Sequence, residues 1–252
     1  MFPYKDDNPT ILTPYVTVGI IVVTSVVWFL VQGAGAGGPM LRSLCELALI
    51  PGDLTGRIPD GTMVPLGPNA QCQLGGFGWH TMVSSMFLHG GWLHLIGNMW
   101  FLWVFGNNIE DAMGPGRFVA FYLVCGLLAA AAQISVNPSS AIPMVGASGA
   151  ISGIMGAYLV LYPRVRVHML VVLGFFITTI AVPASFMLVY WMFLQLVGSI
   201  FAGGEGGGVA FMAHLGGFIA GVVLIKLFAK PELLAAHARP RVQVGTHGRR
   251  GE

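Results

Sequence analysis

The sequence predicts an all-α polytopic membrane protein with six transmembrane helices. Of its 252 residues, 55% are hydrophobic and only 9% are charged, and the mean hydropathy is +0.77. A water-soluble surface normally requires about 25% charged residues, so this chain could not cover one. Several apolar runs also reach the roughly 20 residues that cross a bilayer as a helix.

Six apolar runs between helix-breaking residues define the predicted spans. They lie at about 11–32, 91–108, 117–136, 146–162, 184–202 and 209–229. The first run has no basic segment before it and is too long for a signal-peptide core, so we expect a helix there. Residues 33–90 form a long external loop in this arrangement.

The segment 165–183, "VRVHMLVVLGFFITTIAVP", is apolar but rich in β-branched residues. It lies between the basic residue Arg164 and Pro183, and it follows a predicted span directly. We therefore predict an interfacial or re-entrant segment here, and not a seventh span.

The distribution of basic residues predicts that both termini are cytoplasmic. The cytoplasmic side then receives ten of the twelve basic residues: Lys5, Arg117, Arg164, Arg166, Lys226, Lys230, Arg239, Arg241, Arg249 and Arg250. The external loop receives only Arg42 and Arg57. Residues 1–10 become a cytoplasmic N-terminus, and residues 230–252 a basic, disordered tail that can contact anionic lipid. Because the basic residues do not form a groove-sized patch, nucleic acid is not an expected partner.

Three predicted spans bring polar side chains to one layer near the outer face. His94 and Asn98 lie near the outer end of the second span, Ser148 near that of the fourth, and His214 near that of the sixth. His94 and Asn98 are four residues apart and share one helix face. Strongly polar groups are costly inside a membrane and tend to mark functional sites.

Small residues surround this polar layer. Ser148 lies in "GASGAISGIMG", with Gly149 beside it, and His214 is followed by Gly217 and Gly221. Such residues let two helix backbones approach closely, which can place the serine hydroxyl within reach of the imidazole. A serine, a base and two further polar side chains form the minimum set for acyl transfer. No acidic residue lies near the outer ends of these spans, so the sequence permits a Ser-His dyad and not a Ser-His-Asp triad.

Four motifs together resemble the rhomboid intramembrane serine proteases. They are "HLIGN", "GASGAISGIMG", "AHLGGFIAG" and "GNNIEDAMG". Their order, spacing and depth agree with that family over about 79–229. The resemblance implies six helices around a water-accessible cavity that opens to the outer face, without a metal or an organic cofactor.

The resemblance also implies a role for each matching residue. Ser148 would be the nucleophile and His214 the general base. The oxyanion hole would consist of His94, Asn98 and the backbone N–H of Ser148, and Gly146 would leave room for the oxyanion. The substrates would be single-pass membrane proteins, cut in or near the outer part of their spanning helix, usually after a small residue. The compact form suggests a bacterial inner membrane.

Other matching positions are structural or depart from the family pattern. Glu110 would be a structural turn residue facing the cytoplasm. Members of the family often carry an aromatic residue four positions after the serine, stacked on the catalytic histidine, and here that position is Ser152. The first external loop often carries a Trp-Arg pair, and here it has Trp79 and His80.

Two other functions fit parts of the sequence. One is a catalytically inactive rhomboid-like protein that binds membrane clients. The other is a transporter or channel, although the polar residues form a single layer and show no inverted repeat. Glycine-rich faces serve internal packing and dimers alike, so the sequence indicates no oligomeric state.

The remaining histidines and cysteines give weaker signals. A metal site from His80, His89 and His94 is not predicted, because the last two do not share a helix face and no carboxylate or thiolate completes the set. Cys45 and Cys72 lie in the external loop, where their spacing permits either a disulfide or two free thiols.

Overall fold

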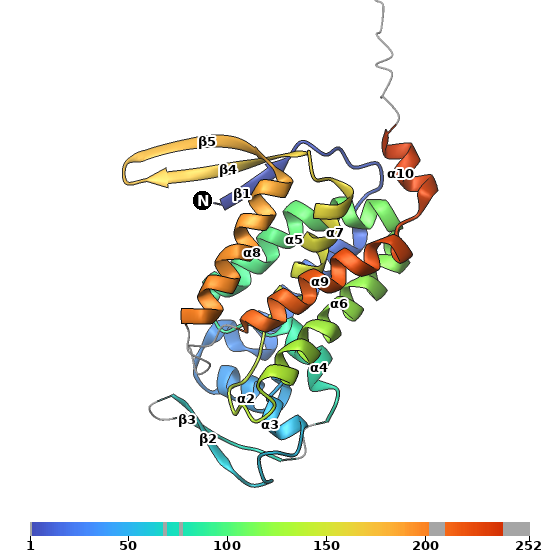
Figure 1. Cartoon of the computed structure of the whole chain (residues 1–252). Helices are drawn as coiled ribbons and strands as arrows, with labels where there is room; N and C mark the ends of the chain where they lie inside the picture. Colours follow the sequence, from blue (N-terminus) through green and yellow to red (C-terminus); the bar gives the residue numbers. More distant parts are fainter. Residues whose placement is uncertain (1, 68–69, 76–77, 202–209, 239–252) are drawn as a thin grey trace, which may run out of the picture.

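The structure is a computed structural model that describes residues 2–67, 70–75, 78–201 and 210–238. It is mostly helical, and each of the six predicted spans coincides with a helix to within a few residues. These helices are α1 (Tyr15–Val26, continued by a π-helical turn, Val27–Val31), α5 (Trp92–Met113), α6 (Pro115–Val136), α7 (Ser148–Leu161), α8 (Ala184–Phe201) and α9 (Phe211–Phe228). Figure 1 shows them side by side in one bundle.

Two of these helices, α6 and α9, are long and apolar enough to cross a membrane on their own. Three shorter apolar helices, Tyr15–Val31, Ser148–Leu161 and Ala184–Gly198, accompany them. The predicted ends at residues 202 and 209 lie outside the described residues.

Helix α7 lies at the centre of the bundle and packs mainly against α9 and α6. Glycines make this packing close. A Cβ atom at Gly149 would lie 2.6 Å from the Cβ of Ala129 on α6, and one at Gly153 would lie 3.2 Å from the carbonyl oxygen of Gly217 on α9. On α9, a Cβ at Gly217 would overlap the backbone of Gly149. The small residues thus let α7 and α9 meet backbone to backbone, as in small-xxx-small helix pairs.

Carboxylates at the end of α5 hold the start of α1. Glu110 is buried and accepts hydrogen bonds from the backbone N–H groups of Val16 and Thr17 at 3.0 and 2.7 Å, and from the Thr17 hydroxyl at 2.7 Å. The neighbouring Asp111 accepts from the N–H groups of Ile11 and Leu12. A carboxylate here satisfies N–H groups in the first turn of a helix and complements its dipole. Glu110 therefore has a structural role: its carboxylate caps the start of α1.

The segment 165–183 is a β-hairpin, a secondary structure that the prediction of an interfacial or re-entrant segment did not specify. Strands β4 (Arg166–Leu173) and β5 (Phe176–Pro183) are antiparallel and joined at Gly174, whose φ of +60° favours glycine. Alternate residues of β4, Val167, Met169 and Val171, are buried. This two-residue period is that of a strand with one covered face, and it explains why the segment does not form a helix.

The N-terminal segment is also a strand, although the sequence predicted only a cytoplasmic terminus. Strand β1 (Phe2–Asp6) pairs with β4 and completes a sheet of order β1-β4-β5. Polar contacts fix it in place: Tyr158 of α7 donates a hydrogen bond to Asp6, and Nε2 of His168 on β4 lies 2.8 Å from Oδ1 of Asp7. Burial of the Asp6 carboxyl raises its pKa.

The predicted external loop, 33–90, carries its own short elements. Helices α2 (Gly37–Leu47), α3 (Pro51–Leu54) and α4 (Thr81–Ser84) lie with strands β2 (Met63–Gly67) and β3 (Ala70–Gln73) at the end of the bundle away from the β4–β5 hairpin (Figure 1). A disulfide joins Cys45 of α2 to Cys72 of β3. Of the two possibilities that the sequence left open, the structure shows the bonded pair.

The chain after α9 differs in part from the predicted disordered tail. Residues Pro231–Ala238 form a helix, α10. Proline is well suited to the first helical position, and the Leu and Ala residues that follow are good helix formers. The N–H of Lys230 donates to the carbonyl of Ala112 at 2.9 Å and so places α10 beside the end of α5. The rest of the predicted tail, residues 239–252, lies outside the described residues.

Candidate active site

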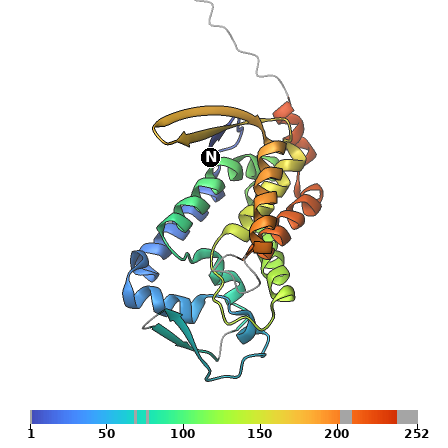
Figure 2. The ribbon, with the colours of Figure 1, turned by 60° about the vertical axis from the view of Figure 1, so that its left-hand side comes forward.

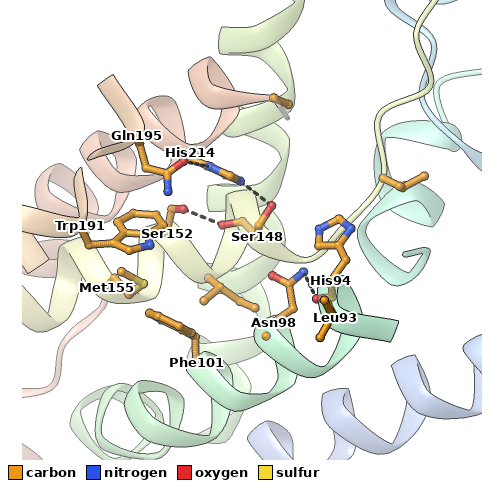
Figure 3. Close-up of a pocket in the computed structure, with 14 residues that line it drawn as sticks. Leu93, His94, Asn98, Phe101, Ser148, Ser152, Met155, Trp191, Gln195 and His214 are labelled. Atoms are coloured by element: carbon orange, nitrogen blue, oxygen red, sulfur yellow. Dashed lines mark hydrogen bonds between the residues drawn. The ribbon is translucent and has the colours of Figure 1, made fainter. Parts of the chain in front are cut away.

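A cavity of about 460 Å³ lies between α5, α7, α8 and α9. Its walls are largely apolar and include Phe101, Met155 and Trp191. The polar side chains in the wall come from all four helices, and Figure 3 shows them facing a common space. They include the serine, both histidines and the asparagine that the sequence predicted for one layer.

The serine and the histidine predicted as a dyad are in direct contact. Ser148 is the first residue of α7, and its Oγ lies 2.7 Å from Nε2 of His214 on α9 (Figure 3). The helix crossing described above positions the two side chains, because Gly149 and Gly217 bring α7 and α9 together beside them. A hydroxyl in this geometry can give its proton to the imidazole and become a nucleophile.

The residue two positions before Ser148 must be glycine. Gly146 has a φ of +122°, which favours glycine. A Cβ atom there would lie 2.8 Å from Nε2 of His94 and 3.6 Å from Oγ of Ser148. The N–H of Gly146 donates to the carbonyl of Ser85 at 2.9 Å, so this backbone is held in place. The space beside the hydroxyl is therefore kept free of side-chain atoms.

His94 and Asn98 of α5 lie on the other side of Ser148 from Gln195 (Figure 3). Nδ1 of His94 accepts a hydrogen bond from the N–H of Gly90 at 3.3 Å, so the ring proton is on Nε2, on the side of the ring that faces Gly146. The Nδ2 atom of Asn98 donates to the carbonyl oxygen of His94 at 3.0 Å, which uses one of its two N–H groups. Two N–H donors thus remain on side chains that line the same cavity as Ser148.

A family model of the rhomboid domain matches residues 76–231. The chain belongs to the rhomboid family. The match covers more than half of this rhomboid, including α5 to α9 and the whole candidate site. Members of the family are integral membrane proteins, so this rhomboid is one as well.

Named relatives of this rhomboid include proteins from bacteria and from plants. Rhomboid-like protein 11, chloroplastic, from Arabidopsis thaliana is 30% identical over 155 residues, which are 60% of this chain and 53% of the relative. Rhomboid protease GluP from Bacillus subtilis is 35% identical over 98 residues, 39% of this chain and 19% of that protein. Putative rhomboid protease YdcA of the same bacterium is 32% identical over 81 residues, 32% of this chain and 40% of that protein. This rhomboid therefore spans about half, or less, of the length of these relatives.

The second serine of the motif is engaged elsewhere. Ser152 is buried, and its Oγ donates a hydrogen bond to the carbonyl oxygen of Ser148 at 2.6 Å. It lines the cavity but bonds to the backbone of its own helix. At the position where rhomboids often carry an aromatic residue, this chain has no ring to stack on His214.

Two residues of α8 that the sequence analysis missed contact His214 instead. The ring of Trp191 lies 5.9 Å from the imidazole, centroid to centroid, and Oε1 of Gln195 lies 2.8 Å from its Nδ1. Gln195 is the only amide side chain in the apolar run 184–201. A lone amide in a membrane helix was the signal that could have identified it.

The remaining sequence candidates are not part of the Ser148–His214 contact. His89 is fully buried behind His94, with ring centroids 5.0 Å apart; burial, and then the neighbouring His94, lower its pKa to about 3. Trp79 and His80 are exposed. Within the ranges that the structure describes, no group of three His, Cys, Asp or Glu side chains is placed to hold a metal ion.

Proposed function

We propose that this rhomboid is an intramembrane serine protease that hydrolyses peptide bonds in or near the transmembrane helix of single-pass membrane proteins. The observation that carries the proposal is the 2.7 Å contact between Ser148 Oγ and His214 Nε2 in a cavity that also holds His94 and Asn98. Two relatives from Bacillus subtilis are named as a protease and a putative protease, which supports the same reading.

The first half of the reaction forms an acyl-enzyme. Ser148 Oγ attacks the carbonyl carbon of the scissile bond while His214 Nε2 takes the hydroxyl proton. The oxygen of the tetrahedral intermediate accepts hydrogen bonds from His94 Nε2–H, the Asn98 amide and the N–H of Ser148, in the space left by Gly146. The N–H of Ser148 is available because the first N–H groups of a helix have no partner within it, and the α7 dipole also favours a negative charge there.

Collapse of the intermediate breaks the carbon–nitrogen bond. The proton held on His214 passes to the leaving amine, which departs as the new amino terminus. A water molecule then attacks the acyl-enzyme, again with His214 as the base, and releases the new carboxyl terminus and Ser148. No metal or organic cofactor takes part in this scheme.

The proposed topology has six membrane-spanning helices, with both termini in the cytoplasm and the cavity open to the outer face. The excess of basic residues on one side supports it. A substrate helix must unwind to expose a peptide bond, so we expect cleavage near its outer end, where Gly, Pro or polar residues weaken the helix. The bacterial inner membrane is the proposed location, and an organellar membrane is the alternative suggested by the chloroplastic relative.

The test compares the purified parent protein with two serine variants in liposomes. The substrate is a single-pass protein whose spanning helix has a Gly/Ala-rich outer end. We expect cleavage by the parent and by Ser152→Ala, and none by Ser148→Ala. Cleavage by Ser148→Ala would assign the nucleophile elsewhere. Failure of all three proteins on several substrates, while each remains folded, would favour a rhomboid-like protein that only binds membrane clients.

A further inference from the structure

The tip of the β4–β5 hairpin carries exposed apolar side chains. Phe175 is fully exposed and Phe176 is 81% exposed, and Val172 and Ile177 beside them are exposed as well. The hairpin projects sideways from one end of the bundle, past α8, in both views (Figures 1 and 2). Moving a large apolar side chain such as Phe out of water is favourable, so an aqueous position for this tip would be unfavourable.

The charges of the hairpin are arranged as in an interfacial element. No Lys, Arg, Asp or Glu occurs from 167 to 183, and His168 is paired with Asp7. The basic residues lie at the root, where Arg164 and Arg166 are exposed. An apolar tip beyond a basic root can place its rings among acyl chains and its guanidinium groups near lipid phosphates.

The backbone limits how deep the hairpin can lie. Strand β5 is at the edge of the sheet and pairs with β4 on one side only. Its free N–H and C=O groups need water or headgroups as partners, which hydrocarbon does not offer. The hairpin can therefore enter the headgroup region, but it cannot cross the bilayer core.

The neighbouring helix continues the same apolar surface. Helix α8 follows β5 directly and exposes Phe186, Val189 and Phe193. An apolar groove of about 160 Å³ between the hairpin and α8, lined by Ile180 and Phe186, connects the two surfaces. In an integral membrane protein, an exposed apolar helix face meets lipid, and the hairpin extends that face outward.

We propose that the β4–β5 hairpin lies in the lipid headgroup region beside α8 and inserts Phe175 and Phe176 at the boundary of the acyl chains. The partner is the lipid leaflet itself. The hairpin then fixes the depth of the ends of α7 and α8 that it joins. This inference uses the membrane location of the family and does not depend on protease activity.

Fluorescence quenching in liposomes tests the position of the tip. Phe176→Cys is labelled with an environment-sensitive fluorophore, and Arg57→Cys in the predicted external loop serves as the aqueous control. Labelling at these positions is selective because Cys45 and Cys72 are bonded and Cys125 is buried. We expect a lipid-attached spin label to quench the probe at 176 and aqueous iodide to quench it little, with the reverse at 57.

Equal iodide quenching at both positions would overturn the proposal. The proposal would also be wrong if the probe at 176 were shielded from iodide only at high protein density and lost this shielding on dilution into excess lipid. That result would mean that a second copy of the chain covers the tip.

A second inference concerns Gln195, and it rests on the proposed function. With Oε1 of Gln195 2.8 Å from Nδ1 of His214, the carboxamide oxygen accepts the Nδ1 proton. The neutral imidazole then has its lone pair on Nε2, which faces the Ser148 hydroxyl at 2.7 Å. This tautomer is the one that a general base requires.

We infer that Gln195 is a positioning residue that holds His214 in its basic tautomer and orientation. Ser152 cannot do so, because it bonds to the backbone of α7 and has no ring. Trp191, one helical turn before Gln195, flanks the same imidazole. Helix α8 therefore supplies an orienting group for the base where the acidic member of a triad is lacking.

Two variants of similar length test this role. Gln195→Met removes the acceptor, and Gln195→Glu keeps an acceptor oxygen. We expect the Met variant to lose about tenfold or more in kcat with little change in KM, and the Glu variant to recover most of that loss. The rate at which a fluorophosphonate labels Ser148 should fall in parallel, while the melting temperature stays close to that of the parent.

The inference is wrong if the Met variant labels and cleaves within about twofold of the parent. Failure of the proposed function looks different, because the parent itself would then neither cleave nor be labelled at Ser148.

Discussion

Gly146 and His94 lie so close together that a single added carbon atom would collide with the imidazole: a Cβ atom at 146 would be 2.8 Å from Nε2. We therefore expect Gly146→Ala to lose cleavage activity by about 10²-fold or more, because the methyl group fills the space proposed for the oxyanion. Steady-state kinetics in liposomes measure the effect.

The matched control for this variant is Gly91→Ala. Gly91, the residue just before α5, has an extended φ of 168°, and a Cβ atom there meets nothing within 4 Å. Its activity should remain within about twofold of the parent. Full activity of Gly146→Ala would show that the oxyanion lies elsewhere.

Replacing Glu110 should lower the stability of the folded protein without changing its catalysis. Replacing it by Gln removes the negative charge and leaves one of the α1 N–H groups without its acceptor, so unfolding should become easier by about 1–3 kcal/mol. Thermal unfolding in one detergent measures this, with Glu46→Gln, an exposed position, as the control. A variant as stable as the parent would contradict the cap on α1.

Replacing Gly221 on α9 should show how much stability is lost when α7 and α9 are pushed apart. A Cβ atom there would overlap the backbone of Gly153 on α7, so Gly221→Ala should lower stability by about 1–3 kcal/mol and also reduce labelling of Ser148. The control is Gly19→Ala in α1, where a Cβ meets nothing within 4 Å and alanine should be neutral or stabilising. Equal melting temperatures for the two variants would argue against the close crossing.

The disulfide between Cys45 and Cys72 closes a separation of 27 residues. In the chain-entropy account such a bond stabilises by roughly 3.5 kcal/mol, so reductant should lower the melting temperature of the parent and not that of a Cys45→Ser, Cys72→Ser variant. Intact mass after alkylation, with and without reductant, identifies the bonded form. Alkylation of both thiols without reductant would contradict the bridge.

Protonation of His89 should account for part of the loss of folding stability at acid pH. Its pKa is lowered to about 3 in the folded protein from 6.5, first by burial and then by His94. Between these two values the unfolded chain binds a proton that the folded protein does not, so stability falls as the pH drops below 6.5. The difference in melting temperature between pH 7 and pH 4.5 should be smaller in His89→Leu than in the parent. An unchanged difference would mean that other groups dominate.

The helices and the contact between Ser148 and His214 could be expected from the sequence because each depends on local patterns. The lengths of the apolar runs predicted the helices. The serine and the histidine were predicted to meet because they lie at the same depth in the membrane and are flanked by glycines. The hairpin could be placed but not recognised as β-structure, since its alternation of buried residues is hidden in a continuous apolar run. Its partner strand, β1, lies more than 150 residues away.

Gln195 and the carboxylate caps were not apparent for a different reason. A single amide in a generic apolar run acquires a role only when α8 packs beside α9, and sequence spacing does not reveal that contact. Glu110 was expected to be structural, but its partner Thr17 is 93 residues away, and no pattern connects the two.

The pairing of β1 with β4 has a consequence for biosynthesis. Phe2 lies opposite Leu170, so a ribosome working at about 5–20 residues per second completes the partner strand on the order of ten to thirty seconds after the first residues emerge. During that interval the N-terminal strand has no ladder to join, whereas α1 can already enter the membrane. The β1–β4 ladder therefore cannot form until the chain has been made as far as Leu170. A nascent chain that stalls before β4 would leave its N-terminal strand open to proteases.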